Sequence, residues 1–457
     1  MSIDIYLRFL ARHHGLIGSN RRAGSNGLYE AIGQLQGLDI PAVAWERDIL
    51  PARVEQYRTE LLDELCLTGE VGWGRLFPPA RDPDKSRPMA SLTRVAPISL
   101  FLREDSAWLI SRAPQPDLDG LSSPAAQICE ILESRGAMFA SDLLTATQML
   151  PTQLEDVLGE LVTRGWITAD GFSGLRTLIA EKSPQGRRAI LHRSERRRIA
   201  NTAMGRWSLR VHCPRLNSGS GPDSSLASAS GLAPGPATRP DAGSASRSSV
   251  PPGSEPATKK PDTKPIVSRT ANAAETAVQI EHWAWQLLRR WGVVYRDLIA
   301  REEGAPAWFE VLQVLRRLEA RGEIRGGRFI VGVGGEQFAM PDAIQQLRRL
   351  RDEPAQQELL VISAADPLNL VGIVTRHDRI PRTAGNRVAF IEGRPVASFQ
   401  AGEICWLETP PQDLRQTIVD RLVGPAGEIK EVTAGSRSTV SKTSNPASQN
   451  SPPRWSW

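Results

Sequence analysis

Two glutamines and an aspartate near the start of this sequence are the residues best suited to chemistry. Gln34, Gln36 and Asp39 lie at the end of one expected helix, in the stretch QLQGLDIP. Beside DNA, amides and a carboxylate could position a water against a sugar and stabilise a departing base, as base excision requires. The alternative is structural, because Asp39 stands two residues before Pro41, a spacing typical of a helix N-cap. The sequence leaves both interpretations open.

Arginines form two dense clusters that could bind phosphate groups. In the first, residues 181–210, nine Lys or Arg residues face two acids, and the second spans residues 316–328. Contacts between arginine and phosphate give salt-sensitive affinity for nucleic acid that is independent of base sequence. A solvated basic face without any partner remains the alternative. The candidate nucleic-acid-binding residues are Arg187, Arg188, Arg193, Arg196, Arg197, Arg198, Arg316, Arg317, Arg321, Arg325 and Arg328.

A pattern that occurs three times supplies the elements that would position these residues. The copies are LLDELCLTGEVGWGRL, LGELVTRGWITADGF and LRRLEARGEIRGGRF. In each, two leucines three residues apart share one helical face, and a glycine follows four residues later, where a helix can end in the left-handed region. The glycines are Gly69, Gly165 and Gly322.

A β-branched residue two positions after each glycine opens an expected strand, which should turn back within about three residues. This order is typical of the third helix and the wing, a β-hairpin, of a winged-helix domain. Two shorter helical patterns precede each copy, so we predict three winged-helix units. Three unrelated helical hairpins are the alternative. The strands are expected to begin at Val71, Ile167 and Ile324, with turns at 72–74, 169–171 and 326–327.

The composition favours a multidomain protein of the reduced cytoplasm. A chain of 457 residues is too long for one core. Its four cysteines are widely spaced, without a metal-ligand pattern, so neither a metal nor a cofactor is expected. No apolar run approaches the roughly 18 residues of a membrane span, and no secretory signal opens the chain. A nucleotide-driven motor would need a phosphate-binding glycine loop, and the sequence has none.

Composition also divides the chain. Residues 217–275 and 424–457 are rich in Ser, Ala, Pro and Gly, and cannot bury enough apolar area to offset their ordering entropy. Short strands between 359 and 406, with a Glu392-Gly393 hairpin turn, predict a small β-barrel. The fold class is therefore α+β, multidomain. We expect winged-helix units at 1–115, 116–180 and 276–340, a basic segment at 181–216, a disordered linker at 217–275, a barrel module at 341–423 and a disordered tail at 424–457.

Several phrases together resemble one protein family. YLRFLARHHGL, LQGLDIPAVAWERDILPARV, GRWSL, GVVYRDLIARE and SAADPLNLVGI are similar to the C-terminal region of long bacterial Lhr-type ATP-dependent DNA helicases. The resemblance covers about 370 residues, everything except the linker and tail. It implies winged helices and a β-barrel module, similar in fold to winged-helix DNA glycosylases, and a motor that precedes this region in the family. The catalytic pair of those glycosylases would fall on Gln34 with Gln36, or on Gln36 with Leu38 or Asp39.

Three functions follow as expectations. The first is a DNA-binding accessory module, for single- or double-stranded DNA, that serves a separately encoded helicase motor. The second is a stand-alone base-excision enzyme acting through Gln36 and Asp39. The third is a scaffold for protein assembly, because winged helices also pair with one another. Under this third hypothesis the chain could form homo-oligomers.

Overall fold

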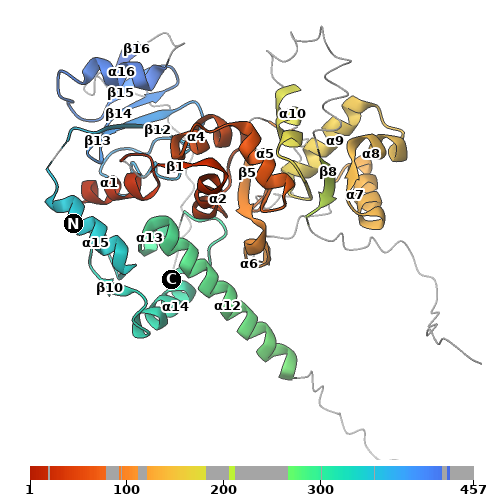
Figure 1. Cartoon of the computed structure of the whole chain (residues 1–457), viewed down its shortest axis with the longest axis horizontal. Coiled ribbons are helices and arrows are strands. Elements are labelled where there is room, and N and C mark those ends of the chain that lie inside the picture. Colours follow the sequence, from red (N-terminus) through yellow and green to blue (C-terminus); the bar gives the residue numbers. More distant parts are fainter. Residues whose placement is uncertain are drawn as a thin grey trace, which may run out of the picture. The chain divides into compact units, whose positions relative to one another are not determined.

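The structure is a computed structural model in which part of the chain is described (Figure 1). By its contacts the chain divides into two units, Met1–Cys213 with Ala277–Trp457, and Pro214–Thr276. The described elements belong to the first of these units, except that α12 begins in the second. Most of the expected linker and tail lies outside the described residues, which are 1–18, 21–78, 92–93, 95–111, 121–181, 205–210, 266–299, 301–354, 356–424 and 430–432.

The first winged-helix unit follows a short N-terminal helix, α1 (Ile3–His13). Its three-stranded sheet has the order β2-β5-β4, so the strand that returns from the wing lies in the centre. The second helical position is broken into α3, a π-helical turn and α4. The elements are β1 (Arg22–Ala23), α2 (Gly24–Leu35), β2 (Ile40–Pro41), α3 (Ala42–Ala44), η1 (Trp45–Ile49), α4 (Leu50–Arg53), β3 (Val54–Glu55), α5 (Thr59–Leu67), β4 (Val71–Gly74), β5 (Pro97–Leu102), η2 (Arg103–Asp105) and α6 (Ser106–Ser111).

The second unit repeats this topology with the strand order β6-β8-β7. Its returning strand β8 pairs antiparallel with both neighbours, although it lies in the segment expected to be only basic. Residues 206–209 thus complete the sheet of a domain whose other described elements end at residue 181. The elements are α7 (Ser123–Arg135), β6 (Met138–Phe139), α8 (Ala140–Thr147), α9 (Pro151–Thr163), β7 (Ile167–Ala169), α10 (Ser173–Glu181) and β8 (Arg206–Leu209).

The third unit has the same order again, β10-β11-β9. Its first helix, α12, is 26 residues long and begins at Ile266, inside the expected linker. Even this helix is not apolar enough to cross a membrane, and neither is any other described helix. The elements are α12 (Ile266–Trp291), β9 (Val293–Val294), α13 (Arg296–Ile299), α14 (Trp308–Ala320), β10 (Arg325–Gly327), β11 (Gln337–Ala339) and α15 (Pro341–Asp352).

The three glycine stops are confirmed. Gly69, Gly165 and Gly322 have φ values of +83°, +77° and +81°. Each end is a Schellman motif, in which two N–H groups close back on the last helical turn. After α9, for example, the N–H of Gly165 donates to Val162 O at 3.0 Å and that of Trp166 donates to Leu161 O at 2.9 Å. The leucine-glycine spacing therefore marks the end of the third helix in all three units.

The expected tight wing turns are wrong. Strand β4 continues through residues 72–74, and the returning strands begin only at Pro97, Arg206 and Gln337. The glycines serve packing instead of turning. A Cβ at Gly72 would lie 2.8 Å from the Phe101 ring, which packs on that strand from β5. The glycines thus suggested a turn, whereas the fold needs them where a neighbouring side chain lies close to the strand backbone.

The barrel module contains an open sheet of five strands in the order β12-β13-β14-β15-β16. No pairing among the strands that the structure describes joins its two edges, so the expected closed barrel is not formed. The hairpin turn is confirmed, with positive φ at both Glu392 and Gly393. The elements are β12 (Leu359–Ser363), β13 (Arg387–Ile391), β14 (Arg394–Gln400), β15 (Glu403–Trp406), α16 (Arg415–Val423) and β16 (Lys430–Val432).

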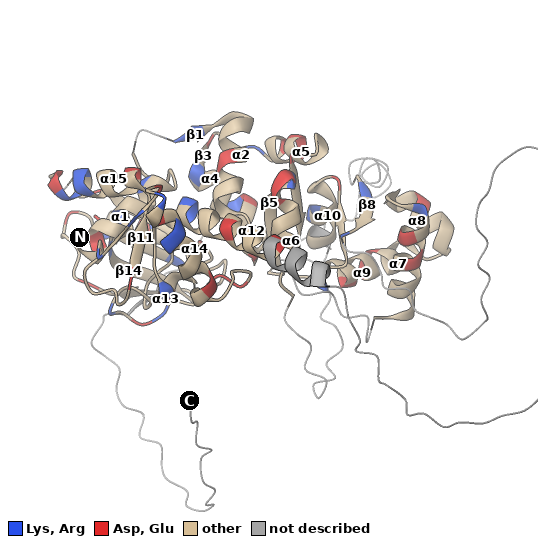
Figure 2. Cartoon of the chain, turned by 90° about the horizontal axis from the view of Figure 1, so that it is seen from below, with Lys and Arg blue, Asp and Glu red and all other residues tan. Residues whose placement is uncertain are grey.

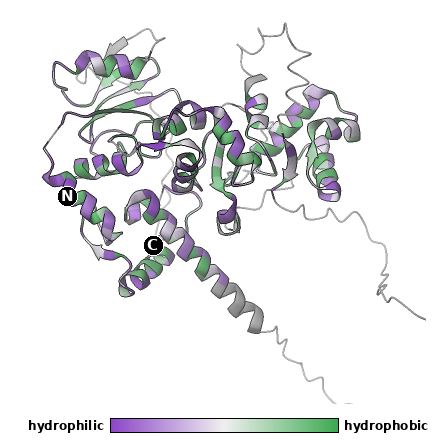
Figure 3. Ribbon diagram, viewed as in Figure 1, coloured by the Kyte–Doolittle hydropathy of each residue, from purple (hydrophilic) through white to green (hydrophobic). Residues whose placement is uncertain are grey.

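Hydrophobic cores join these units instead of separating them. The first and second winged-helix units share one core, and α16 covers another on the five-stranded sheet. Helix α1 does not pack into the first unit, where the sequence placed it, but into the core of the third unit and the sheet. The Tyr6 hydroxyl donates toward Trp291 O and Val293 O, both at 3.2 Å. Along the helices, hydrophobic and hydrophilic residues alternate as expected for one buried face (Figure 3).

Candidate nucleic-acid interface

The third helices of the three units differ in charge. In helix-turn-helix folds this helix lies in the major groove, so its exposed side chains face phosphates and bases. Helices α5 and α9 each carry three acids and no Lys or Arg, whereas α14 carries two exposed arginines along with two acids, Glu310 and Glu319. Only the third unit therefore presents cations from this position. The residues are Glu60, Asp63 and Glu64 on α5, Glu155, Asp156 and Glu160 on α9, and Arg316 and Arg317 on α14.

The wings of the first and second units are packed against each other. Strand β4 is buried along its whole length. The Trp73 indole donates to Gly171 O at 3.1 Å, and the Thr168 hydroxyl donates to Trp73 O at 2.5 Å. Trp73 also meets Trp207 edge to face, with 6.1 Å between ring centroids. These strands are buried in the interface between the two units and therefore cannot enter a nucleic-acid groove.

The third unit carries exposed arginines on its third helix and wing. Arg317 on α14, Arg325 on β10 and Arg328 beyond it are solvent-exposed, and none has a carboxylate partner among the described residues. We call these three residues the basic surface; blue segments mark Lys and Arg on α14 in Figure 2. Such guanidinium groups are available to phosphate oxygens without first breaking an ion pair.

The other two predicted arginines of this cluster are engaged in ion pairs. Arg316 lies 2.8 Å from Glu336, and Arg321 lies 2.6 Å from Glu281. All four side chains are substantially exposed, so solvent screens these pairs and a phosphate could compete with the carboxylates. The remaining predicted residues, Arg187, Arg188, Arg193, Arg196, Arg197 and Arg198, lie outside the described residues.

Sequence reasoning missed a further set of arginines on α15. Arg348, Arg349 and Arg351 are exposed there, and Arg351 pairs with the adjacent Asp352 at 2.8 Å. The signal was present in the stretch QQLRRLRD, but that stretch was assigned to the barrel module. Helix α15 in fact packs its apolar face, including Leu347 and Leu350, into the core of the third unit.

The two candidate catalytic glutamines are occupied by structural hydrogen bonds. The Gln36 amide donates to Asp105 Oδ2 at 2.6 Å and to Gln286 Oε1 at 3.1 Å, and its carbonyl accepts from Leu102 N. Gln34 accepts from Arg22 at 2.9 Å and donates to His13 O. Both side chains are buried, so neither amide is available to a departing base.

Asp39 has a different environment. Its carboxylate accepts from the Ser99 hydroxyl at 2.6 Å and from the N–H groups of Leu76 and Phe77 at 3.4 and 3.2 Å. Burial raises the pKa of this carboxyl, and the hydrogen bonds counteract part of that shift. The N-cap interpretation is wrong, because Pro41 occupies the N-cap of α3 and no side chain caps that helix.

The charges of two arginines and a glutamate act on the Asp39 carboxylate. The charges of Arg75 and Arg210 interact with its carboxylate, and the charge of Glu303 opposes it. Burial lowers the pKa of Arg210 to about 10, with the Asp39 carboxylate acting in the opposite direction. Asp39 is therefore the one predicted catalytic residue with an environment that tunes its proton affinity.

The glutamines are buried because α2 docks against α12. At this interface Arg290 pairs with Glu302 and donates to the main-chain carbonyls of Gln34, at 3.1 Å, and of Gln36. The His14 imidazole donates to Arg290 O at 2.8 Å. Burial, followed by the charge of Arg53, holds the pKa of His14 well below its ordinary value, so the ring is neutral.

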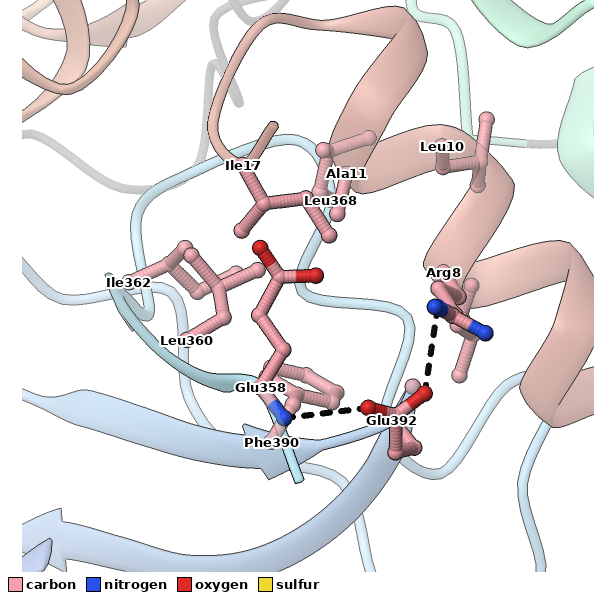
Figure 4. Close-up of a pocket in the computed structure, with 12 residues that line it drawn as sticks. Arg8, Leu10, Ala11, Ile17, Glu358, Leu360, Ile362, Leu368, Phe390 and Glu392 are labelled. Atoms are coloured by element: carbon pink, nitrogen blue, oxygen red, sulfur yellow. Dashed lines mark hydrogen bonds and ion pairs between the residues drawn. The ribbon is translucent and has the colours of Figure 1, made fainter. Parts of the chain in front are cut away.

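A small cavity between α1 and the five-stranded sheet is lined by apolar side chains and three charged residues. The Glu358 carboxylate points into it toward Ile17 and Leu368, while Glu392 accepts from the Glu358 N–H at 3.0 Å and pairs with Arg8 at 3.1 Å (Figure 4). Its volume is about 20 Å³, roughly that of one water molecule. This cavity is too small for a nucleotide.

Family comparisons match the two units that pack around these sites. A profile for a winged-helix domain of the large helicase-related protein, the third in that family, matches residues 2–88, and the profile for the fourth matches residues 273–359. The first range contains α2 to β4, and the second contains most of α12 and the elements from β9 to α15. The chain carries Lhr-type winged-helix domains.

Two curated Lhr proteins are similar along most of this chain. An "Lhr helicase/ probable uracil glycosylase" from Mycolicibacterium smegmatis is 27% identical over 415 residues, covering 88% of this chain and 23% of the relative. An "Lhr helicase/uracil glycosylase" from Escherichia coli is 28% identical over 375 residues, covering 76% of this chain and 20% of the relative. The chain thus spans less than a quarter of the length of these Lhr relatives.

Proposed function

We propose that the chain is a DNA-binding accessory module of the Lhr type, which holds DNA for a helicase motor. The observation that carries the proposal is the basic surface, Arg317, Arg325 and Arg328, on the third helix and wing of the third unit. The acidic α5 and α9 and the packed wings leave this unit as the contact best suited to a duplex. The similarity to Lhr helicases agrees with that role.

The proposal predicts salt-dependent binding. Each phosphate neutralised on a duplex contributes about −0.9 to the slope of log affinity against log salt. Replacing Arg317 and Arg325 together with alanine should therefore lower duplex affinity about tenfold at moderate salt and flatten the slope by about 1.8. Fluorescence anisotropy with a labelled duplex over a range of salt concentrations measures both quantities.

The matched control is Arg135→Ala. Arg135 is exposed at the end of α7, the first helix of the second unit, away from any third helix or wing. Its removal takes away the same kind of charge and should leave affinity and slope within twofold of the parent protein. Equal losses in the control and in the double variant would show that general charge, and not the basic surface, binds DNA.

Base excision is a second candidate, favoured by the environment of Asp39. A half-buried carboxyl whose pKa is raised binds a proton more readily than an ordinary aspartate, so it could deprotonate a water that attacks the sugar. The names of both curated relatives include uracil glycosylase, in one case as probable. Gln34 and Gln36 do not take part in this proposal, because they join α2 to α12, to η2 and to β5.

Asp39→Asn tests this second function. The amide retains an acceptor for Ser99 but cannot remove a proton, so release of uracil from a duplex should fall by at least about 100-fold. Alkaline cleavage of the abasic product provides the measurement, with Arg135→Ala as the control. Equal product from the parent and Asp39→Asn proteins, or none from either, would remove base excision from consideration.

A further inference from the structure

A groove beside the wing of the third unit has a composition suited to nucleotides. It runs between the start of α1, the segment after β10 and α15, and its volume is about 390 Å³. Arg328, Arg348 and Arg351 line it together with the Phe329 ring and the aliphatic Ile5 and Ile344. The volume falls in the range of small-ligand sites, and it is large enough for a single nucleotide.

We propose that this groove binds one nucleotide of a single-stranded nucleic acid, with its phosphate on the arginines and its base against Phe329. The inference rests on the proposed function and deepens it, because it gives the module a separate contact for an unpaired strand. Cationic side chains next to an aromatic ring are the usual means of binding single strands without sequence preference.

The charge of the groove favours an anion. Its lining includes three arginines and no carboxylate. Arg328 and Arg348 have no ion-pair partner among the described residues, and Arg351 pairs only with its exposed neighbour Asp352. A phosphate entering the groove therefore meets up to three guanidinium groups and displaces at most one solvent-screened contact.

The aromatic wall is fixed in place by the backbone. The Phe329 carbonyl accepts from Met1 N at 2.7 Å, and its N–H donates to the Gln337 side chain at 2.8 Å. Gln337 is buried and its amide donates back to Ile330 O at 3.0 Å. The ring is half-buried, so one part packs on the core and the rest is available to a base. A wall that is already ordered loses little entropy when a base stacks on it.

A nucleic-acid strand fits better than an acidic peptide. Arg328 belongs to both the groove and the basic surface, so a strand separated from a duplex on the wing could continue into the groove. A peptide carboxylate would use the arginines but has no need of the Phe329 ring. Stacking on that ring is the feature that distinguishes the two occupants.

The decisive variant is Arg348→Ala/Arg351→Ala, with Arg349→Ala as the matched control. All three arginines are exposed on α15, but Arg349 does not line the groove. The probe is a labelled oligo(dT) of roughly 12 nucleotides, within the usual site sizes for single strands. Its affinity should fall about tenfold in the double variant, and the salt slope should flatten by about 1.4, or about 0.7 for each lost contact. The control should match the parent protein.

Further arms separate this inference from the proposed function. Duplex affinity should remain within twofold of the parent in the α15 double variant, whereas Arg317→Ala/Arg325→Ala should weaken duplex binding. If the parent protein binds duplex but the α15 double variant keeps its oligo(dT) affinity, the groove proposal is refuted and the proposed function is not. Failure to bind either DNA overturns both proposals.

Competition and crosslinking identify the occupant. Unlabelled oligo(dT) should displace the probe at far lower concentration than thymidine monophosphate, inorganic phosphate or polyglutamate. An iodouracil-substituted strand should photo-crosslink to Phe329, as read by peptide mass spectrometry, and the double variant should lose that crosslink. Equal competition by polyglutamate, or crosslinks only outside the groove, would refute a stacked nucleotide.

Discussion

Replacing Arg53 with methionine should lower the free energy of unfolding by about 3–5 kcal/mol. Arg53 and Asp366 form a bidentate pair at 2.7 and 2.9 Å, and both side chains are almost completely buried. The pair joins α4 of the first unit to the loop that follows β12. Removing the guanidinium leaves the Asp366 carboxylate buried without its counter-charge, while its remaining described bond comes from Leu368 N. Denaturant unfolding followed by tryptophan fluorescence gives the loss.

Two further variants test the cause of this loss. Arg58→Met removes an exposed arginine from the same unit and should change stability by less than about 0.5 kcal/mol. Arg53→Met/Asp366→Asn also removes the carboxylate charge that Arg53→Met leaves unpaired. This double variant should therefore regain part of the lost stability. A double variant no more stable than Arg53→Met would show that the loss comes from side-chain packing and not from the unpaired carboxylate.

Arg290→Met should have an effect of similar size, about 3–5 kcal/mol. This variant leaves the buried Glu302 carboxylate without its counter-charge, and it removes a hydrogen-bond donor from the main-chain carbonyls of Gln34 and Gln36. Because those carbonyls end α2, the first unit should also detach from α12. Hydrogen exchange read by mass spectrometry should then increase in peptides from both helices, in addition to the loss measured by denaturant unfolding.

The neighbouring Arg289 provides the control for this experiment. It lies on the same helix but its side chain is exposed, and its main-chain carbonyl accepts from Gln34 of the first unit and from His13 of α1. Arg289→Met should therefore leave both stability and exchange close to those of the parent protein. Similar losses for the two variants would contradict the assignment of the interface to the Arg290 guanidinium.

Local patterns predicted the repeated units well, for a physical reason. A helix that ends in a Schellman motif needs a glycine at a fixed distance from its buried leucines, and both requirements lie within eight residues of sequence. Leu62, Leu65 and Gly69 therefore determine one helix end without any distant partner. The same holds for the Glu392-Gly393 turn, because a two-residue hairpin is specified by its own backbone conformation.

Features that depend on distant partners could not be obtained in this way. Gln36 looked catalytic because its partners, Asp105 and Gln286, lie 69 and 250 residues away in the sequence. Nothing in the spacing of the strands indicated that the five-stranded sheet would stay open. The positions of the returning strands were also missed, because each wing is interrupted by an insertion with no hairpin signature.

The candidate interface was only partly accessible to sequence reasoning. The arginine cluster at 316–328 was identified, but exposure and pairing divide it into the basic surface and two ion-paired residues. The acidity of α5 and α9 could have been counted from the sequence once the third helices were recognised. The groove could not have been found from the sequence, because its walls come from residues at the two ends of a 350-residue interval that only the tertiary fold brings together.

The position of α1 has a consequence for biosynthesis. Its apolar residues, including Tyr6, Phe9 and Leu10, pack on partners that follow roughly 270–380 residues later in the chain. A chain emerging from the ribosome therefore exposes this helix until α12 and the sheet have been translated, and closure of so long a loop is slow. Nascent chains stalled before residue 277 present an unpaired apolar helix, which is the kind of surface that chaperones bind and that promotes aggregation.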